Sequence, residues 1–375
     1  MSVSEAERVA LARARELALR GRGLVSPNPL VGAVVLRDGE TVAEGWHEGP
    51  GLPHAEAAAL AAAGEAARGA TVVCTLEPCS HHGRTPPCAD ALAAAGIARA
   101  VIGMLDPLES GRAQGREVLS AAGIDVAVAN GADAEACAEQ NAAFLTWAVT
   151  GLPHVTLKLA TSLDGRIATA GGESRWISGP ESRALVHRWR ADHDAVGIGI
   201  GTALADDPRL TARDVEGPLR QPARVVFDSA ARLPLRSALV HEAREHRLIV
   251  LAAADAPVER IAALEAAGVE VARLEGGPAR RVSAGLRALG ERGIQSLLIE
   301  GGAELAGALV AADAVDRVAW FLAPMLIGGR GAPAALGGAG APTLALAPRM
   351  AGLTAEPVGE DLLVSGRLRP LARAS

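Results

Sequence analysis

The sequence predicts two successive α/β domains, and two observations carry this prediction. In the first 145 residues, short segments rich in β-branched and apolar residues alternate with Ala-rich stretches of helical length. The same alternation begins again after residue 153 and continues through residue 322. A chain of 375 residues also exceeds the usual span of one domain, so each half is expected to have its own core.

The first half is expected to form a sheet flanked by helices. Residues 1–22 have the pattern of an amphipathic helix and lack the uncharged core of a signal peptide. A helix over 133–144 is followed by Thr150-Gly151-Leu152-Pro153, whose glycine and proline would end a helix. We therefore expect domains at 1–147 and 152–372. The other predicted elements are strands at 31–36, 70–75, 100–103 and 125–128 and helices at 54–67, 89–95 and 115–122.

The second half is expected to be another sheet with helices between several of its strands. Its Gly, Ala and Pro bias over 328–342 predicts a surface loop. The predicted strands are 155–160, 195–200, 224–227, 247–251, 296–299 and 317–322.

Composition and charge restrict the class of protein. The net charge of −6 is uneven, because residues 1–145 contain 11 arginines and 18 acidic residues, a net charge of −7. An acidic surface repels a phosphate backbone, so no nucleic-acid partner is expected. No uncharged stretch is both long and apolar enough to span a bilayer, so we expect a soluble cytoplasmic protein without membrane contact. Four scattered cysteines do not form a disulfide framework, whereas a local group is more often metal-binding or catalytic.

Three residues with the chemistry of zinc ligands occur near predicted element ends. His54 opens an Ala-rich helix, Cys79 follows a strand, and Cys88 begins the next helical stretch. Three N and S ligands leave a fourth position for water, which zinc would acidify to hydroxide near neutral pH. Glu56 is expected to face this water without binding the metal and to carry a proton to the departing amine. This arrangement is typical of zinc-dependent nucleobase deaminases.

Each of these residues also has a simpler interpretation. His54 could be an ordinary helix-start histidine, the cysteines could be free thiols, or the zinc could be purely structural. The order and placement of His54-Ala55-Glu56, Thr75-Leu76-Glu77-Pro78-Cys79 and Pro87-Cys88 together favour catalysis. Cys74 and Cys137 are expected to be buried small hydrophobic residues.

Eight residues separate Cys79 from Cys88, where the general deaminase pattern has two. This insertion, with Asn28-Pro29-Leu30-Val31-Gly32 upstream, resembles the deaminase half of the bifunctional riboflavin-biosynthesis deaminase/reductase family. The resemblance covers nearly the whole chain. It implies a cytidine-deaminase-like three-layer α/β/α domain that deaminates a diaminopyrimidine bearing a phosphoribosylamino group. By position, Asn28 and His47 would contact the base, and His81, Arg84 and Thr85 the ribose and phosphate.

One position departs from the family pattern. The family has Asp-Pro-Asn-Pro after the fourth strand, whereas Asp106-Pro107 is followed here by Leu108 and Glu109. An asparagine that would contact the substrate is therefore missing.

Lys158 is the only lysine in the chain and lies in a predicted strand. An ammonium is a compact charge that a guanidinium cannot imitate, so a site that needs a point donor would retain it. A lysine left by chance at a strand edge is an equally good explanation.

The strand holding Lys158 continues into Thr161-Ser162-Leu163-Asp164-Gly165-Arg166-Ile167-Ala168. This string, with residues 172–178 and 201–213, resembles the reductase half of the same family. The resemblance implies a dihydrofolate-reductase-like α/β domain that uses NADPH to reduce the ribosyl group to ribityl, and we expect Lys158 to be the donor or orienting group. It implies an NADPH site at Ala160, Trp176, Thr202, Asp206 and Ser229, and substrate contacts at Ser174, Arg190, Leu210, Arg213 and Glu300. Gly301, Gly302, Ala303 and Glu304 follow a predicted strand at a helix start, where glycines permit close approach and free N–H groups suit a cofactor phosphate.

The predicted function is therefore a bifunctional enzyme that uses zinc and NADPH on small phosphoribosylated pyrimidines. One alternative is a nucleoside or tRNA deaminase fused to an unrelated α/β domain, although the acidic charge disfavours tRNA. Another is a zinc-containing binding protein without turnover, which Glu56 disfavours because a structural zinc has four closed ligands and needs no proton shuttle. The lack of tyrosine excludes a Tyr-dependent short-chain dehydrogenase. A homo-oligomer is an open expectation.

Overall fold

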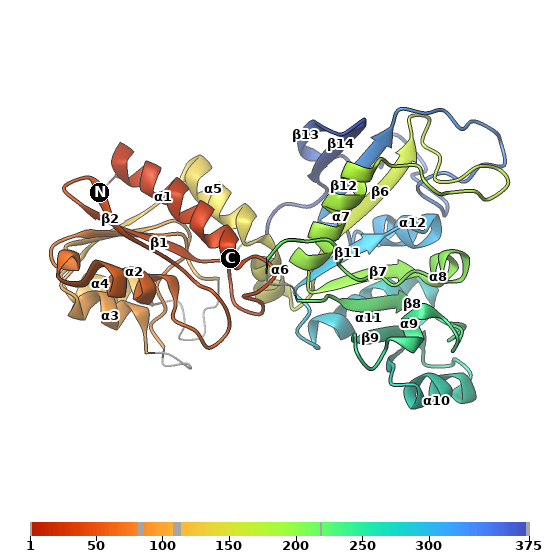
Figure 1. Cartoon of the computed structure of the whole chain (residues 1–375), viewed down its shortest axis with the longest axis horizontal. Coiled ribbons are helices and arrows are strands. Elements are labelled where there is room, and N and C mark those ends of the chain that lie inside the picture. Colours follow the sequence, from red (N-terminus) through yellow and green to blue (C-terminus); the bar gives the residue numbers. More distant parts are fainter. Residues whose placement is uncertain (1, 82–85, 108–113, 218–219, 373–375) are drawn as a thin grey trace. The chain divides into compact units, whose positions relative to one another are not determined.

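The computed structural model describes residues 2–81, 86–107, 114–217 and 220–372. The chain divides after Thr150 into two compact units, the second spanning Gly151–Pro370. Each unit is built around a single sheet (Figure 1). In the described ranges, no helix is long and apolar enough to cross a membrane.

The first unit is a three-layer α/β/α sandwich. Its sheet has the order β2-β1-β3-β4-β5, in which β1 is antiparallel to both neighbours and β3, β4 and β5 are parallel. Helices α1 and α5 cover one face, and α2, α3 and α4 cover the other (Figure 1). The strands are β1 (Gly32–Arg37), β2 (Glu40–Trp46), β3 (Thr71–Cys74), β4 (Arg99–Ile102) and β5 (Asp125–Val128), and the helices are α1 (Glu5–Ala18), α2 (Ala55–Ala63), α3 (Cys88–Ala94), α4 (Gly115–Ala121), α5 (Gly131–Gln140) and α6 (Ala142–Thr150).

Helix α1 shows how local sequence and packing agree in this unit. Ser4 caps the helix and forms a capping box with Glu7. Leu11, Ala14 and Leu17 lie on one face of the helix and are at most 1 % exposed. The apolar face of α1 is thereby buried against the sheet, and the charged residues other than Glu7 are at least partly exposed.

The second unit contains a nine-stranded sheet of order β10-β9-β8-β7-β11-β6-β12-β14-β13. The strands from β10 to β12 in this order are parallel, and β14 and β13 add an antiparallel edge. The strands are β6 (His154–Ser162), β7 (Ala195–Gly199), β8 (Ala223–Phe227), β9 (Leu248–Ala253), β10 (Glu270–Leu274), β11 (Ser296–Glu300), β12 (Arg317–Ala323), β13 (Ala351–Val358) and β14 (Asp361–Arg367).

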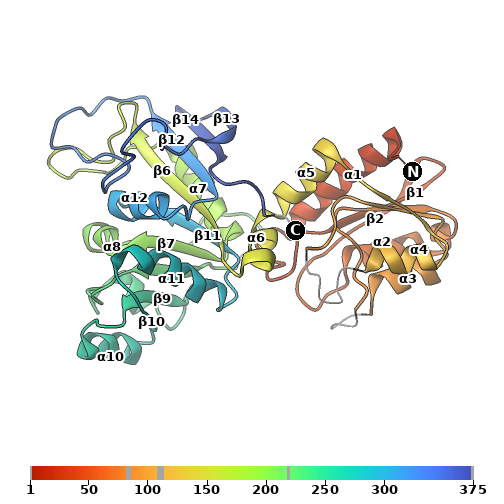
Figure 2. The same ribbon diagram turned by 180° about the vertical axis from the view of Figure 1, so that it is seen from behind.

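Helices cover both faces of this sheet. Successive strand residues point to opposite faces, so each face carries apolar side chains that a helix buries. In β11, Leu297 packs into the core beneath α11 and α12, and Leu298 packs into the core beneath α9 and α10. Figure 2 shows the unit from behind. The helices are α7 (Pro180–Asp192), α8 (Ile200–Asp206), α9 (Ala238–His241), α10 (Val258–Ala266), α11 (Pro278–Gly290) and α12 (Ala303–Ala311).

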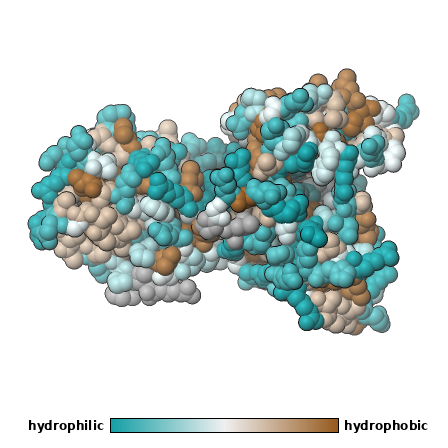
Figure 3. Space-filling model, in the orientation of Figure 1, coloured by the Kyte–Doolittle hydropathy of each residue, from teal (hydrophilic) through white to brown (hydrophobic). Residues whose placement is uncertain are grey.

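The loop predicted over 328–342 is confirmed. It contains no helix or strand, only the isolated bridge between Ala334 and Arg166. In the second unit, hydrophobic residues gather at the surface near the loops that follow β6 and β12 (Figures 1 and 3), where Leu163, Leu326 and Leu344 are exposed.

The predicted strands are all present, but other expectations were wrong or incomplete. The helix predicted over 133–144 is interrupted at Asn141, between α5 and α6. Strands β2, β10, β13 and β14 were not predicted. Three of these lie at sheet edges, where exposed charged residues replace the apolar run of a buried strand.

Candidate active sites

The predicted zinc ligands are presented by the ends of three elements. His54 is the N-cap residue of α2, and Cys88 is the first residue of α3. Cys79 lies in the turn that follows β3. Helix α2 lies very close to β2, because a Cβ atom at Gly45 would be 2.4 Å from the Ala55 carbonyl oxygen. The glycine therefore allows α2 to place His54 and Glu56 beside the sheet.

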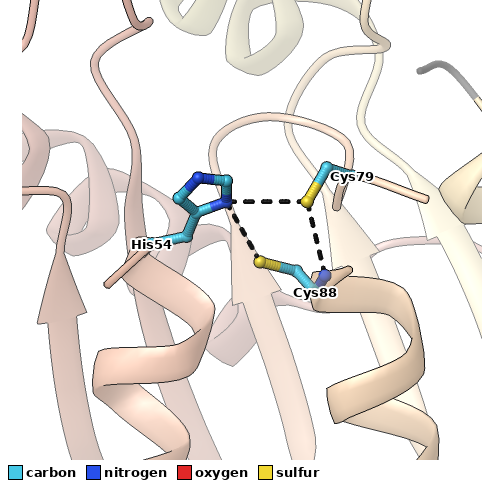
Figure 4. A group of neighbouring side chains, drawn as sticks. All are labelled: His54, Cys79 and Cys88. Carbon is cyan, nitrogen blue, oxygen red and sulfur yellow. Dashed lines mark hydrogen bonds between the residues drawn. The ribbon is translucent and has the colours of Figure 1, made fainter. Parts of the chain in front are cut away.

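These three side chains point toward one another (Figure 4). His54 Nδ1 lies 3.5 Å from Cys79 Sγ and 3.3 Å from Cys88 Sγ. The three potential ligand atoms all lie within 4.8 Å of one another. One imidazole nitrogen and two thiol sulfurs at this spacing fit a tetrahedral zinc ion with one open position.

Hydrogen bonding favours charge separation within this group. The hydrogen bond from Cys88 lowers the pKa of the Cys79 thiol to about 4, and the His54 imidazole contributes in the same direction. The hydrogen bond to Cys79 in turn raises the pKa of His54. The surroundings thus stabilise a thiolate, which is the form of cysteine that binds a metal.

Glu56 lies beside this group and is only 3 % exposed. Burial raises the pKa of its carboxyl group to about 7. His54, Glu56 and Cys79 all line a cavity of about 540 Å³. A carboxyl group, a candidate metal centre and space for a small molecule therefore occur together.

Asn28 and His47 line the same cavity and are hydrogen-bonded to each other. His47 Nδ1 donates to the Pro53 carbonyl oxygen at 3.0 Å, so Nε2 accepts from Asn28 Nδ2 at 2.9 Å. Burial lowers the pKa of His47, which favours this neutral form. This bond uses one of the two Asn28 amide hydrogens, so the amide oxygen can still accept a hydrogen bond from a ligand.

His81 also lines the cavity, and its buried Nδ1 has no hydrogen-bond partner among the described residues. Arg84, Thr85 and Leu108 lie outside the described residues. Sequence reasoning missed other residues that line this cavity. The cavity wall includes Leu52, Glu77, Asp106, Phe144 and Trp147.

In the second unit, most of the predicted cofactor residues follow the carboxyl ends of parallel strands. Thr202 and Asp206 lie in α8 after β7, and Ser229 comes just after β8. Gly301 and Gly302 connect β11 to α12, which begins with Ala303 and Glu304, and Ala160 lies near the end of β6. These ends meet at one edge of the sheet, where open α/β sheets bind ligands. Trp176 is 68 % exposed, and the Arg183 guanidinium lies 4.6 Å from its ring centroid.

Arg190 and Glu300 form a nearly buried ion pair. Arg190 Nε and Nη2 donate to the two Glu300 carboxylate oxygens at 2.5 and 2.9 Å, and Nη1 donates to the Thr211 carbonyl oxygen. Burial alone would raise the pKa of Glu300, but the charge and hydrogen bonds of Arg190 lower it overall. Arg190 therefore orients Glu300.

Lys158 belongs to the same charged group. Loss of hydration lowers its pKa, an effect that Glu300 opposes and Arg190 reinforces. Its ammonium lies 5.7 Å from the Phe321 ring centroid. Arg213 donates to Thr211 Oγ1 through Nη1, and its backbone N–H donates to His187 Nδ1. Leu210 is buried with a positive φ of 58°, while Ser174 is only partly exposed.

The junction between β11 and α12 is shaped for close approach of a ligand. Gly302 has φ +86° and is the N-cap residue of α12, without a side-chain cap. A Cβ atom there would lie 3.0 Å from Thr202 Oγ1. The first turn of α12 therefore has no side-chain cap, and uncapped N–H groups at a helix start are suited to an anionic ligand.

We expect Gly302→Ala to raise the KM for NADPH about tenfold, equivalent to roughly 1.4 kcal/mol of lost binding, because the methyl group crowds this junction. The matched control is Gly293→Ala, since Gly293 also has a positive φ (+77°) but open space around its Cβ position. Both variants should lose about 1 kcal/mol of stability. An equal KM in the two variants, measured by NADPH oxidation, would contradict a cofactor site here.

Two protein families match this chain. Residues 4–104 match the cytidine and deoxycytidylate deaminase zinc-binding region, and residues 153–364 match the RibD C-terminal domain. The riboflavin biosynthesis protein RibD of Actinobacillus pleuropneumoniae is 39 % identical over 353 residues, which cover 94 % of this chain and 93 % of that protein. The Escherichia coli protein of the same name is 42 % identical over 333 residues, covering 85 % of this chain and 88 % of its own length.

Solved structures agree with this relationship. Acinetobacter baumannii RibD is 35 % identical and has a TM-score of 0.86, covering 97 % of this chain and 99 % of its own. A Thermotoga maritima diaminohydroxyphosphoribosylaminopyrimidine deaminase/5-amino-6-(5-phosphoribosylamino)uracil reductase is 34 % identical with a TM-score of 0.83, covering 96 % and 98 %. The predicted cytidine-deaminase-like domain followed by a reductase domain is thus confirmed. The chain belongs to the RibD family of riboflavin biosynthesis proteins, bifunctional enzymes that join a zinc-dependent deaminase to a reductase.

Proposed function

We propose that the first domain, residues 1–147, hydrolytically deaminates a diaminohydroxyphosphoribosylaminopyrimidine, and that the second, residues 152–372, reduces the resulting 5-amino-6-(5-phosphoribosylamino)uracil with NADPH. The observation that carries the proposal is the convergence of His54, Cys79 and Cys88 beside buried Glu56 at one cavity. The same combination of activities is named for the Thermotoga maritima relative.

In the deaminase site, His54, Cys79 and Cys88 would hold zinc. The chemistry that zinc supplies when bound is acidification of a water molecule, which provides a nucleophile near neutral pH. Glu56 accepts the proton of that water and delivers it to the departing amine, so the net change replaces the amine by a carbonyl oxygen and releases ammonia. This proton transfer needs no further side chain.

Substrate orientation depends on the other cavity residues. The Asn28 oxygen accepts a hydrogen bond from the pyrimidine, and His47 holds the Asn28 amide in the required orientation. The orphaned Nδ1 of His81 is suited to the ribose or phosphate, and we assign Arg84 and Thr85 to the same end of the substrate. The charged and polar contacts thereby fix one end of the molecule while the base faces Glu56.

In the reductase site, NADPH supplies the hydride when it is bound at Ala160, Trp176, Thr202, Asp206, Ser229 and the 301–304 junction. Arg190 orients Glu300 toward the ribosyl group. Because the Arg190 guanidinium is occupied by Glu300, Arg213 is the better contact for the substrate phosphate. Lys158 donates a proton or hydrogen bond to the group being reduced. Ser174 and Leu210 complete the substrate surface.

The decisive experiment follows ammonia release and NADPH absorbance with the purified full chain and the diaminopyrimidine ribotide. We expect ammonia without NADPH, and NADPH oxidation only after deamination. NADH in place of NADPH tests the cofactor preference. Zinc-loaded protein that releases no ammonia would contradict the proposed deamination.

Substitution of the cysteines tests the proposed zinc ligands. Wild-type protein should contain about one zinc ion per chain, and Cys79→Ala should lose both zinc and deamination, because two ligands do not retain the ion. Cys137→Ala is the matched control, because Cys137 is fully buried and is not one of the three grouped ligand residues. It should cost about 1 kcal/mol of stability but keep zinc. Zinc retained in Cys79→Ala, measured by atomic absorption, would contradict the assigned ligands.

The proposal also includes location and partners. All four cysteines are free, which suits a reducing compartment, and we place the enzyme in the cytoplasm. Its partners are small phosphoribosylated pyrimidines rather than nucleic acid or membrane, in keeping with the acidic charge of the first domain. The oligomeric state remains to be measured by light scattering.

A further inference from the structure

Part of the deaminase cavity is formed by a helix that neither family match includes. The zinc-binding match ends at residue 104, and the reductase match begins at residue 153. Nevertheless, Phe144 and Trp147 of α6 line the cavity that contains His54 and Glu56. The two aromatic residues are three positions apart and so share one face of the helix. Helix α6 thus adds an aromatic surface to a site whose chemistry lies elsewhere in the sequence.

Aromatic residues are scarce in this chain, with three Phe, five Trp and no Tyr. Two of these eight side chains therefore line one cavity. A pyrimidine ring has polar edges and flat faces, and the faces bind well to aromatic side chains. The Asn28 side chain provides a contact for a polar edge, and His47 holds it in place. Helix α6 provides the complementary surface for a ring face.

Asn141 links α6 to the loop that carries Asn28. Asn141 is 3 % exposed, and its side chain forms two hydrogen bonds to the backbone of one residue, Leu30. The Leu30 N–H donates to Asn141 Oδ1 at 2.8 Å, and Asn141 Nδ2 donates to the Leu30 carbonyl oxygen at 2.9 Å. An amide side chain has the separate donor and acceptor atoms that these two hydrogen bonds require. The start of α6 and the Asn28 loop are therefore held together directly.

We propose that α6 is a substrate-recognition wall of the deaminase site. In this arrangement Trp147 packs against the face of the pyrimidine ring, and Asn141 is a positioning residue that holds the wall and Asn28 in register. The inference rests on the proposed function, because it takes the phosphoribosylated diaminopyrimidine as the ligand.

Trp147→Leu in the full-length, zinc-loaded chain tests the contact. Leucine preserves helix propensity but removes the flat ring. We expect the deaminase KM to rise about tenfold, the effect of losing one base–aromatic contact, with kcat within about twofold. Zinc content and reduction of the aminouracil ribotide should stay unchanged. Trp147→Phe, which restores a ring, should recover part of the KM.

Two matched controls separate recognition from folding. Val149→Ala changes an exposed residue of the same helix and should leave the KM unchanged. Asn141→Asp removes the donor to Leu30 and should raise the KM about 3- to 10-fold, whereas Asn130→Asp makes the same chemical change at an exposed position without a side-chain cap bond and should not.

An unchanged deaminase KM in Trp147→Leu would contradict the proposal that α6 recognises the substrate. Loss of kcat together with zinc would also overturn it, because α6 would then only support the fold. Wild-type protein that binds zinc but releases no ammonia from the ribotide would instead contradict the proposed function. The wild-type and variant measurements thus distinguish the two failures.

Discussion

Glu56→Gln should reduce deamination by about 10²- to 10⁴-fold, because the amide cannot accept and return a proton. The side chain is buried beside the cavity and is not one of the three ligand residues. Zinc content should therefore remain that of the wild type. Reduction of the aminouracil ribotide by the second domain should also be unchanged. Ammonia release, atomic absorption and NADPH oxidation measure these three quantities on one sample.

The control for this variant is Glu65→Gln, which makes the same change at an exposed position of the first unit. It should retain full activity. If Glu56→Gln keeps more than about a tenth of the wild-type rate, the carboxyl group is not the proton carrier, because general acid–base catalysis contributes at least about 100-fold. If the variant loses zinc, Glu56 instead supports the metal centre.

Lys158→Met should have the largest effect on the second activity, lowering reduction by about 10²- to 10⁴-fold while deamination continues. Methionine keeps the length and apolar stem of lysine but has no proton to donate. Glu300 keeps its bidentate partner Arg190, so the variant does not leave this carboxylate without a cation. The thermal midpoint should accordingly change little. Reduction is measured with the aminouracil ribotide supplied directly.

Arg188→Met is the control, since Arg188 is an exposed cation on α7, the helix that carries Arg190. It should reduce the substrate normally. Lys158→Arg adds a second test, because it keeps the charge but not the compact donor, and it should remain impaired. Reduction by Lys158→Met within about threefold of wild type, less than a single proton donor contributes, would mean that this lysine is only a strand residue.

Local chemistry explains why the zinc ligands could be predicted. His54, Cys79 and Cys88 each sit at the boundary of a helix or strand that the hydrophobic pattern identifies. Their donor atoms do not depend on a long-range prediction, and the structure brings them within 4.8 Å. Residue type and order were therefore enough to identify the metal chemistry.

The aromatic wall could not be predicted in this way. The pattern over 133–144 resembles one continuous helix, but the helix breaks at Asn141, whose side chain is hydrogen-bonded to Leu30, 111 positions earlier. A helix-length pattern contains no information about such a partner. The sequence therefore assigns no site role to Phe144, at the end of the predicted helix, or to Trp147, although both line the cavity.

By itself, the sequence predicted the two α/β domains, the candidate zinc ligands and the candidate proton carrier Glu56, because these predictions follow from periodicity and from side-chain chemistry at element ends. Only the tertiary structure decided which distant residues share a site. In the structure Arg190 forms an ion pair with Glu300, the Asn28 amide is hydrogen-bonded to His47, and Trp147 lines the deaminase cavity. The physical reason is that local pattern controls backbone conformation, whereas a cavity wall forms from side chains that meet only when the sheet and its helices have packed.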